Sequence, residues 1–124
     1  MRFIDANVIA HAFYESEHQE SCREILREGG VTNTVALIEA FQIISLQTSR
    51  ETATKCIRGI LGRNLLVENV DVNVIFETLK RSDLYMMLSF IDLVHYTVAS
   101  LKNCEAIVTY DLDFDNLEIP REEP

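Results

Sequence analysis

The segment MRFIDANVI, residues 1–9, places a single carboxylate at the end of a short apolar run. Phe3 and Ile4 suit a buried strand, and Asp5 follows at once, before Asn7 and another apolar pair. Two hypotheses explain Asp5 when it is judged alone. It is either the N-cap of a helix beginning near Ala6 or a functional acid at a strand end.

Short apolar segments alternate with helical patterns along the whole chain. Helices are predicted at 6–14, 17–27, 35–46, 49–61, 72–81 and 90–101, and strands at 2–4, 31–33, 65–68, 106–109 and 117–119. Thr34 and Ser49 are predicted N-caps, and Gly29-Gly30 and Gly62 are predicted helix ends. This alternation predicts an α/β domain with a mainly parallel sheet, whose ligands bind beyond the carboxyl ends of its strands.

The composition limits the class of protein. With 124 residues, 48% of them hydrophobic, the chain is expected to form one globular domain over residues 1–124. Apolar runs are only a few residues long, so neither a transmembrane helix nor a signal peptide is predicted. Cys22, Cys56 and Cys104 are widely separated, which favours buried thiols in a reducing cytoplasm over a zinc site or disulfides.

The net charge is −9, so general attraction to nucleic acid is not expected of the whole molecule. The charge is unevenly distributed. Residues 104–124 carry seven acids and one base, Arg121, whereas residues 50–63 carry Glu51 and four bases, Arg50, Lys55, Arg58 and Arg63.

Two further acids lie in apolar helices. Glu39 is surrounded by apolar residues in VALIEAFQII, residues 35–44, where burial of an unpaired charge costs several kcal/mol. A solvent-facing stripe shared with Gln42 explains Glu39 equally well.

Asp92 lies in SFIDLVHYTVA, residues 89–99, three residues after Ser89, and a capping box is the simpler explanation when this acid is judged alone. His95, one turn further on, is a candidate ligand or base. A histidine in an apolar helix is nevertheless more often packed and hydrogen-bonded, and Tyr96 is expected in the core.

A fourth acid, Asp111, opens YDLDFDN, residues 110–116, directly after the predicted strand 106–109. A turn accounts for Asp113 and Asp115, because Asp and Asn side chains bind nearby backbone groups. Asp111 is better placed to project over the edge of the sheet.

Taken together, two acids at strand ends and two on apolar helices can converge on one cleft of a parallel sheet. Because close carboxylates repel, some of them must bind protons or a cation must neutralise them. Oxygen ligands without matching Cys or His indicate Mg²⁺ or Mn²⁺. Such a cluster can activate a water molecule and stabilise the charge that develops on a phosphodiester.

In these motifs the chain resembles the PIN-domain ribonucleases, which include the VapC-like toxins of toxin–antitoxin pairs. FIDANVI is similar to the opening strand of that family and TVALIEAF to its second-acid helix. SFIDLVHYTVA is similar to its third-acid helix, and AIVTYDLDFDNL to the strand and turn that carry the fourth acid. The four motifs occur in the family's order and span nearly the full chain.

The resemblance implies a three-layer α/β/α sandwich and Mg²⁺- or Mn²⁺-dependent cleavage of single-stranded RNA. It also implies a homodimer and a cognate antitoxin whose basic segment enters the acidic cleft. Asp5, Glu39, Asp92 and Asp111 become the catalytic, metal-binding carboxylates, with Asp113 as an auxiliary ligand and Asn7 and Thr109 in supporting roles. Arg50, Lys55, Arg58 and Arg63 are then candidate RNA-binding residues, although a solvated helix face also explains them.

Two other hypotheses remain open at this point. The acidic surface favours a PIN-like module that binds a protein or RNA without cleaving it. A haloacid-dehalogenase-type phosphatase also begins with an Asp after a strand, but that class needs a second Asp two residues on, where this chain has Asn7.

Overall fold

The computed structural model describes residues 1–124. Five parallel strands form one sheet in the order β3-β2-β1-β4-β5. The strands are β1 (Arg2–Ile4), β2 (Gly30–Asn33), β3 (Leu65–Glu68), β4 (Ala106–Val108) and β5 (Arg121–Glu122). The helices are α1 (Ala6–His11), α2 (Gln19–Glu28), α3 (Thr34–Gln47), α4 (Arg50–Leu61), α5 (Val72–Arg81) and α6 (Phe90–Leu101), with a short 3₁₀ helix, η1 (Leu112–Phe114).

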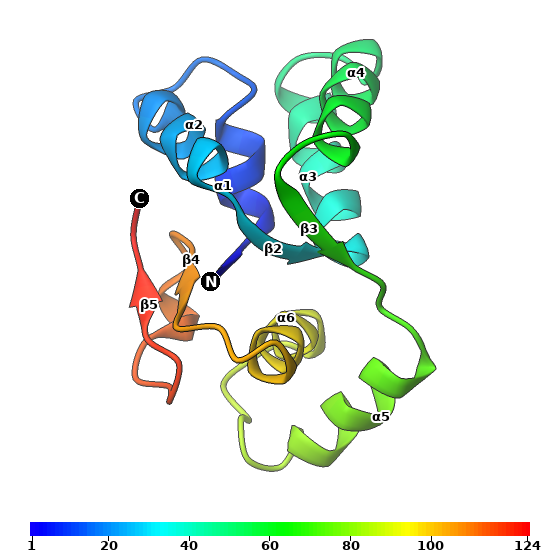
Figure 1. Ribbon diagram of the computed structural model, residues 1–124, viewed down its shortest axis with the longest axis vertical. Helices are drawn as coiled ribbons and strands as arrows, with labels where there is room; N and C mark the ends of the chain where they lie inside the picture. The colour runs from blue at the N-terminus through cyan, green and yellow to red at the C-terminus, as the bar shows by residue number, and fades with distance from the viewer.

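The helices cover both faces of the sheet. Figure 1 shows α1 to α4 on one side of the strands and α5 and α6 on the other. Successive strand residues point to opposite faces, so Ile4 packs into the core beneath α1 to α4 whereas Phe3 packs with Leu93 and Tyr96 of α6. The predicted three-layer α/β/α sandwich with a parallel sheet is therefore confirmed.

The connection from α2 into β2 depends on two glycines. Gly29 ends α2 with a φ of 81°, which favours glycine because it has no Cβ. A Cβ on Gly30 would lie 2.6 Å from the carbonyl oxygen of Arg2 on the neighbouring strand. The predicted helix end is thus also the point where β2 comes close to β1.

Several predicted limits differ from the structure by one or two residues, and three local predictions were clearly wrong. The last strand is not 117–119 but β5, and Ile119 instead donates its N–H to Tyr96 Oη at 3.2 Å. The first helix ends at His11 rather than at residue 14, and the carbonyl of Ala12 accepts a bond from Arg23 Nε at 3.0 Å. Asn33, not Thr34, caps α3, because Asn33 keeps the extended backbone of β2 while its Oδ1 accepts the N–H of Ala36 at 2.8 Å.

Other local predictions were right. Ser49 caps α4 by accepting the N–H of Thr52 at 3.1 Å, and α5 and α6 have the predicted limits. Cys22 and Cys104 are buried free thiols, whereas Cys56 is only half-buried. No helix combines the length and apolar character needed to cross a lipid bilayer.

Helix α5 exposes its apolar residues. Val72, Phe76 and Leu79 follow helical spacing yet face solvent, whereas Thr78 on the opposite side is fully buried. The spacing therefore predicted the helix correctly, and the outward stripe formed by Val72, Ile75, Phe76 and Leu79 is called the α5 stripe below.

Candidate metal centre

The site begins where two adjacent strands end. Ile4 of β1 pairs with Val108 of β4, and the N–H of Asp5 donates to the carbonyl of Val108 at 3.0 Å. Because the strands are parallel, the residues that follow them emerge at the same edge of the sheet. Asp5 is thereby brought beside Thr109 and the loop that carries Asp111.

Asp5 is held by bonds to both of its carboxylate oxygens. Its Oδ1 accepts the N–H of Ala6 at 2.7 Å, and its Oδ2 accepts the hydroxyl of Thr109 at 2.8 Å. The N-cap hypothesis for Asp5 is therefore correct, but it accounts for only one oxygen. Burial raises the pKa of Asp5, a shift that His95 and the hydrogen bond from Thr109 oppose.

Asn7 and Thr109 join the two strand ends. Thr109 Oγ1 accepts bonds from Asn7 Nδ2 at 3.1 Å and from the N–H of Asp111 at 3.0 Å. Asn7 Oδ1 accepts the N–H of Tyr110 at 3.3 Å. These bonds fix the loop after β4 relative to Asp5.

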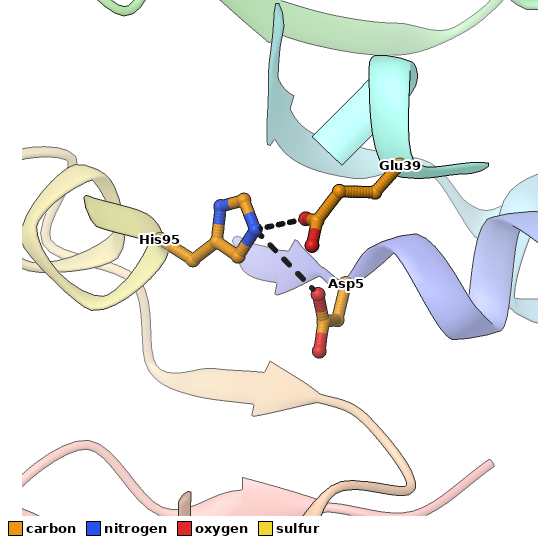
Figure 2. Close-up of side chains that lie close together, drawn as sticks. All are labelled: Asp5, Glu39 and His95. Carbon is orange, nitrogen blue, oxygen red and sulfur yellow. Dashed lines mark hydrogen bonds and ion pairs between the residues drawn. The ribbon is translucent and has the colours of Figure 1, made fainter. Parts of the chain in front are cut away.

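Asp5, Glu39 and His95 form the inner cluster, in which one ligand atom from each residue lies within 4.8 Å of the others (Figure 2). His95 Nε2 lies 2.6 Å from Glu39 Oε1 and 4.0 Å from Asp5 Oδ1. The Glu39 side chain is 34% exposed, while that of His95 is fully buried. Glu39 therefore reaches from the surface of α3 into the site and has a partner there.

Asp92, Asp111 and Asp113 form the outer cluster, defined by the same 4.8 Å limit. Burial, followed by the charges of Asp111 and Asp5, raises the pKa of Asp92 to about 6. The hydroxyl of Thr109 contacts both Asp5 Oδ2 at 2.8 Å and the N–H of Asp111 at 3.0 Å, so the inner and outer clusters adjoin. The four carboxylates singled out in the sequence are therefore brought to one region of the molecule.

The capping and turn hypotheses for the outer acids are also borne out in part. Ser89 Oγ accepts the N–H of Asp92 at 3.1 Å, so Ser89 caps α6 as the sequence predicted. Asp111 Oδ1 accepts the N–H of Asp113 at 2.9 Å at the start of η1. Asp115 pairs with Arg121 Nε at 2.7 Å and does not join either cluster.

Asn33 belongs to the site although the sequence did not single it out. Its Nδ2 lies 2.9 Å from His95 Nδ1, inside the protein. The available signal was a polar residue at the end of a strand, the same signal that identified Asp5. The prediction of Thr34 as the cap of α3 placed Asn33 inside the strand instead.

The four bases of residues 50–63 are exposed, with Arg50, Lys55 and Arg58 on α4 and Arg63 just after it. None forms an ion pair with either cluster, and Lys55 instead pairs with Glu51 at 3.4 Å. Arg63 lines a hollow together with Arg23 and Arg27. The structure therefore does not join these bases directly to the acids.

The donor set of the two clusters fits a hard divalent cation. It offers five carboxylates and no thiol, with the imidazole of His95 beside Asp5 and Glu39. Mg²⁺ and Mn²⁺ prefer such oxygen ligands. Burial is the main reason that the pKa of Asp92 is raised, and a cation would offset the further contribution from the charges of Asp111 and Asp5.

The model of the PIN domain family matches residues 2–120, and the chain therefore belongs to the PIN domain family. This membership confirms the resemblance seen in the motifs. It argues against the hypothesis of a haloacid-dehalogenase-type phosphatase. No curated protein matches the sequence significantly.

Solved structures share the fold. VapC20 of Mycobacterium tuberculosis, a sarcin–ricin loop cleaving toxin, is 14% identical, with a TM-score of 0.81 over 96% of both chains. VapBC2 of Rickettsia felis, bound to a DNA fragment from its promoter, is 17% identical, with a TM-score of 0.74 over 98% of this chain and 97% of that one. A toxin–antitoxin complex from Klebsiella pneumoniae is 11% identical, with a TM-score of 0.72 over 95% and 93%.

Proposed function

We propose that this chain, acting as a single PIN unit, is an endoribonuclease that depends on Mg²⁺ or Mn²⁺ and cleaves single-stranded RNA. The observation that carries the proposal is that four acids from separate parts of the chain lie in two adjoining clusters, Asp5 and Glu39 in the inner one and Asp92 and Asp111 in the outer one. Family membership and the toxins among the structures of the same fold add support.

In this proposal Asp5, Glu39, Asp92 and Asp111 hold the cation, and Asp113 assists from the outer cluster. A bound divalent ion would lower the pKa of a water molecule and neutralise charge on the phosphate. Thr109 and Asn7 keep Asp5 in place through the bonds to its Oδ2 and to the loop after β4. The half-exposed carboxylates of Glu39, Asp92 and Asp111 leave the site open to an extended substrate.

The test is RNA cleavage with Mg²⁺ or Mn²⁺ by wild type and by Asp5→Asn. Asparagine can still cap α1 and contact Thr109, so the fold should persist while the charge is lost. We expect activity to fall at least 100-fold in this variant. Glu118→Gln, which removes an exposed acid from outside both clusters, is the control and should remain active. Equal activity of Asp5→Asn and wild type would reject the proposal.

We further propose that the protein is the toxin of a toxin–antitoxin pair and acts in the cytoplasm. Support comes from the shared fold with a toxin–antitoxin complex and with VapBC2. The partly exposed carboxylates of both clusters suit a basic segment of an antitoxin, because opposite charges attract at an interface. A small open reading frame beside the gene, whose product co-purifies with the chain and inhibits cleavage, is the expected finding.

A homodimer is proposed as well, with the α5 stripe as the contact face. Val72, Phe76 and Leu79 expose a contiguous apolar strip whose burial against a second copy is favourable.

A PIN module that binds a partner without cleaving RNA is the second candidate function. The observation that favours it is the net charge of −9, which opposes general RNA binding. Calorimetry separates the two candidates, because a non-cleaving module is expected to bind its partner without binding Mn²⁺ at millimolar concentration.

A further inference from the structure

The imidazole of His95 is fully buried, and each of its ring nitrogens has a partner. Nδ1 faces Asn33 Nδ2 at 2.9 Å, and Nε2 faces Glu39 Oε1 at 2.6 Å. Figure 2 shows the ring of His95, from α6, reaching toward the carboxylates of Glu39, from α3, and Asp5, which follows β1. The ring thus bridges two helices that flank the candidate metal centre.

The orientation of the Asn33 amide fixes the proton position on His95. Asn33 Oδ1 is occupied as the N-cap of α3, where it accepts the N–H of Ala36 at 2.8 Å. A flipped amide would place its NH₂ against that N–H, so Nδ2 must be the atom that faces the ring. An amide nitrogen can only donate, and therefore His95 Nδ1 accepts and the ring proton resides on Nε2.

We propose that Asn33 and His95 form a positioning relay that orients the Glu39 carboxylate for cation binding. The Nε2–H of His95 donates to Glu39 Oε1 and holds it within reach of Asp5, while Glu39 Oε2 remains available. His95 is a positioning residue in this arrangement and not a metal ligand, because a protonated Nε2 has no lone pair to offer. The cation-binding part of this inference rests on the proposed function.

The relay explains why a histidine occupies a buried and largely apolar stretch of α6. Seven successive residues from Leu93 to Ala99 are buried, and a polar ring there must satisfy both nitrogens. Hydrogen bonds to metal-binding carboxylates commonly tune metal affinity, and their loss weakens binding by about tenfold or more.

The first experiment determines the tautomer and does not depend on any metal or activity. Long-range ¹H–¹⁵N correlation spectra of the metal-free protein at neutral pH should show His95 with its proton on Nε2. A proton on Nδ1 alone would overturn the relay. Asn33→Asp is the control, since one oxygen can still cap α3 while the other turns the Nδ1 partner from a donor into an acceptor. We expect this variant to place a proton on Nδ1.

The second experiment measures Mn²⁺ binding by calorimetry for two matched variants. The amide nitrogen of His95→Gln lies near the Nε2 position and can donate to Glu39, whereas the His95→Asn side chain ends near the Nδ1 position and cannot reach Glu39. We expect His95→Gln to bind Mn²⁺ within about threefold of wild type and His95→Asn to bind about tenfold more weakly.

Both variants place an uncharged amide in the same buried site, so thermal unfolding shows whether their stabilities match. If the two variants differ in stability but bind Mn²⁺ equally, His95 is merely structural and the inference fails. If wild type binds no Mn²⁺, the proposed metal-dependent function fails. In that case the tautomer spectra still decide whether the Asn33–His95–Glu39 contacts exist as inferred.

Discussion

The hydroxyl of Thr109 donates to Asp5 Oδ2 at 2.8 Å, across 104 residues of sequence. The same oxygen of Thr109 accepts the N–H of Asp111 at 3.0 Å. One hydroxyl thus links a buried acid of the inner cluster to the backbone of an acid of the outer cluster. This link explains why two loops that follow different strands present their carboxylates together.

Replacing Thr109 with valine should destabilise the protein. The change keeps the shape of the side chain but removes a bond to the buried Asp5 carboxylate and leaves the Asp111 N–H without its partner. We expect a loss of about 1–3 kcal/mol in the free energy of unfolding, measured by urea denaturation. Thr97→Val is the control, because Thr97 Oγ1 only donates to the carbonyl of Leu93 within α6. Equal losses in the two variants would contradict the linking role of Thr109.

The stability of the metal-free protein should fall as the pH rises from about 4 to about 6. Because the pKa of Asp92 is raised from 3.8 to about 6, the folded chain keeps a proton that the unfolded chain has released in this window. Asp92→Asn does not titrate, so its decline over this window should be smaller. At neutral pH the variant should be more stable than wild type by about 1 kcal/mol, since this half-exposed group is partly screened by solvent. Urea denaturation across the pH range measures both effects, and superimposable curves would refute the prediction.

Mn²⁺ affinity should weaken below pH about 6, where Asp92 is protonated in the folded protein. A proton and a cation compete for the same carboxylate, so affinity should drop by up to about tenfold per pH unit for this one group. Burial also raises the pKa of Asp5, which acts in the same direction. Calorimetric titrations on either side of this pH test the expectation. An affinity that does not change with pH would show that Asp92 does not bind the ion.

Arg58→Gln should weaken RNA binding if the bases of residues 50–63 contact the RNA. Loss of one phosphate contact should lower the slope of log affinity against log salt by about 1. Lys80→Gln is the matched control, because it changes the net charge equally on α5, where Lys80 pairs with Glu77 at 3.0 Å. The measurement is fluorescence anisotropy with a single-stranded RNA. Each substitution is made in the Asp5→Asn variant, so that the RNA is not cleaved while binding is measured. Equal slopes of log affinity against log salt for the two variants would show that Arg58 does not contact the RNA.

Phe76→Glu should convert a dimer into a monomer if the α5 stripe is the contact face. A charge in the centre of this apolar strip would have to be buried without a partner. Light scattering coupled to size-exclusion chromatography reports the mass. Leu46→Glu changes an exposed apolar residue on α3, outside the stripe, and should leave the mass of wild type unchanged. A dimeric Phe76→Glu variant would assign the contact to another face.

The sequence by itself determined the elements and the positions of the acids. Residues 72–81 and 90–101 formed the predicted helices because apolar spacing and capping residues such as Ser89 act over one or two turns. Asp5 and Asp111 could be identified as strand-end acids, because a short apolar run followed by a polar residue is a local signal. Local signals could not separate Asn33 from Thr34 as the cap of α3, since both are good capping residues and the choice depends on where β2 ends.

Only the tertiary structure decided which side chains meet. Asn33 and His95 are 62 residues apart, and they touch because the order of the strands brings the end of β2 beside α6. The exposure of the α5 stripe likewise depends on how α5 packs on α6, which leaves Thr78 rather than Phe76 inside. Periodicity fixes which residues share one face of a helix, whereas the packing of distant elements fixes what that face contacts. For this reason the acids could be found in the sequence, but the contacts among Asn33, His95 and Glu39 could not.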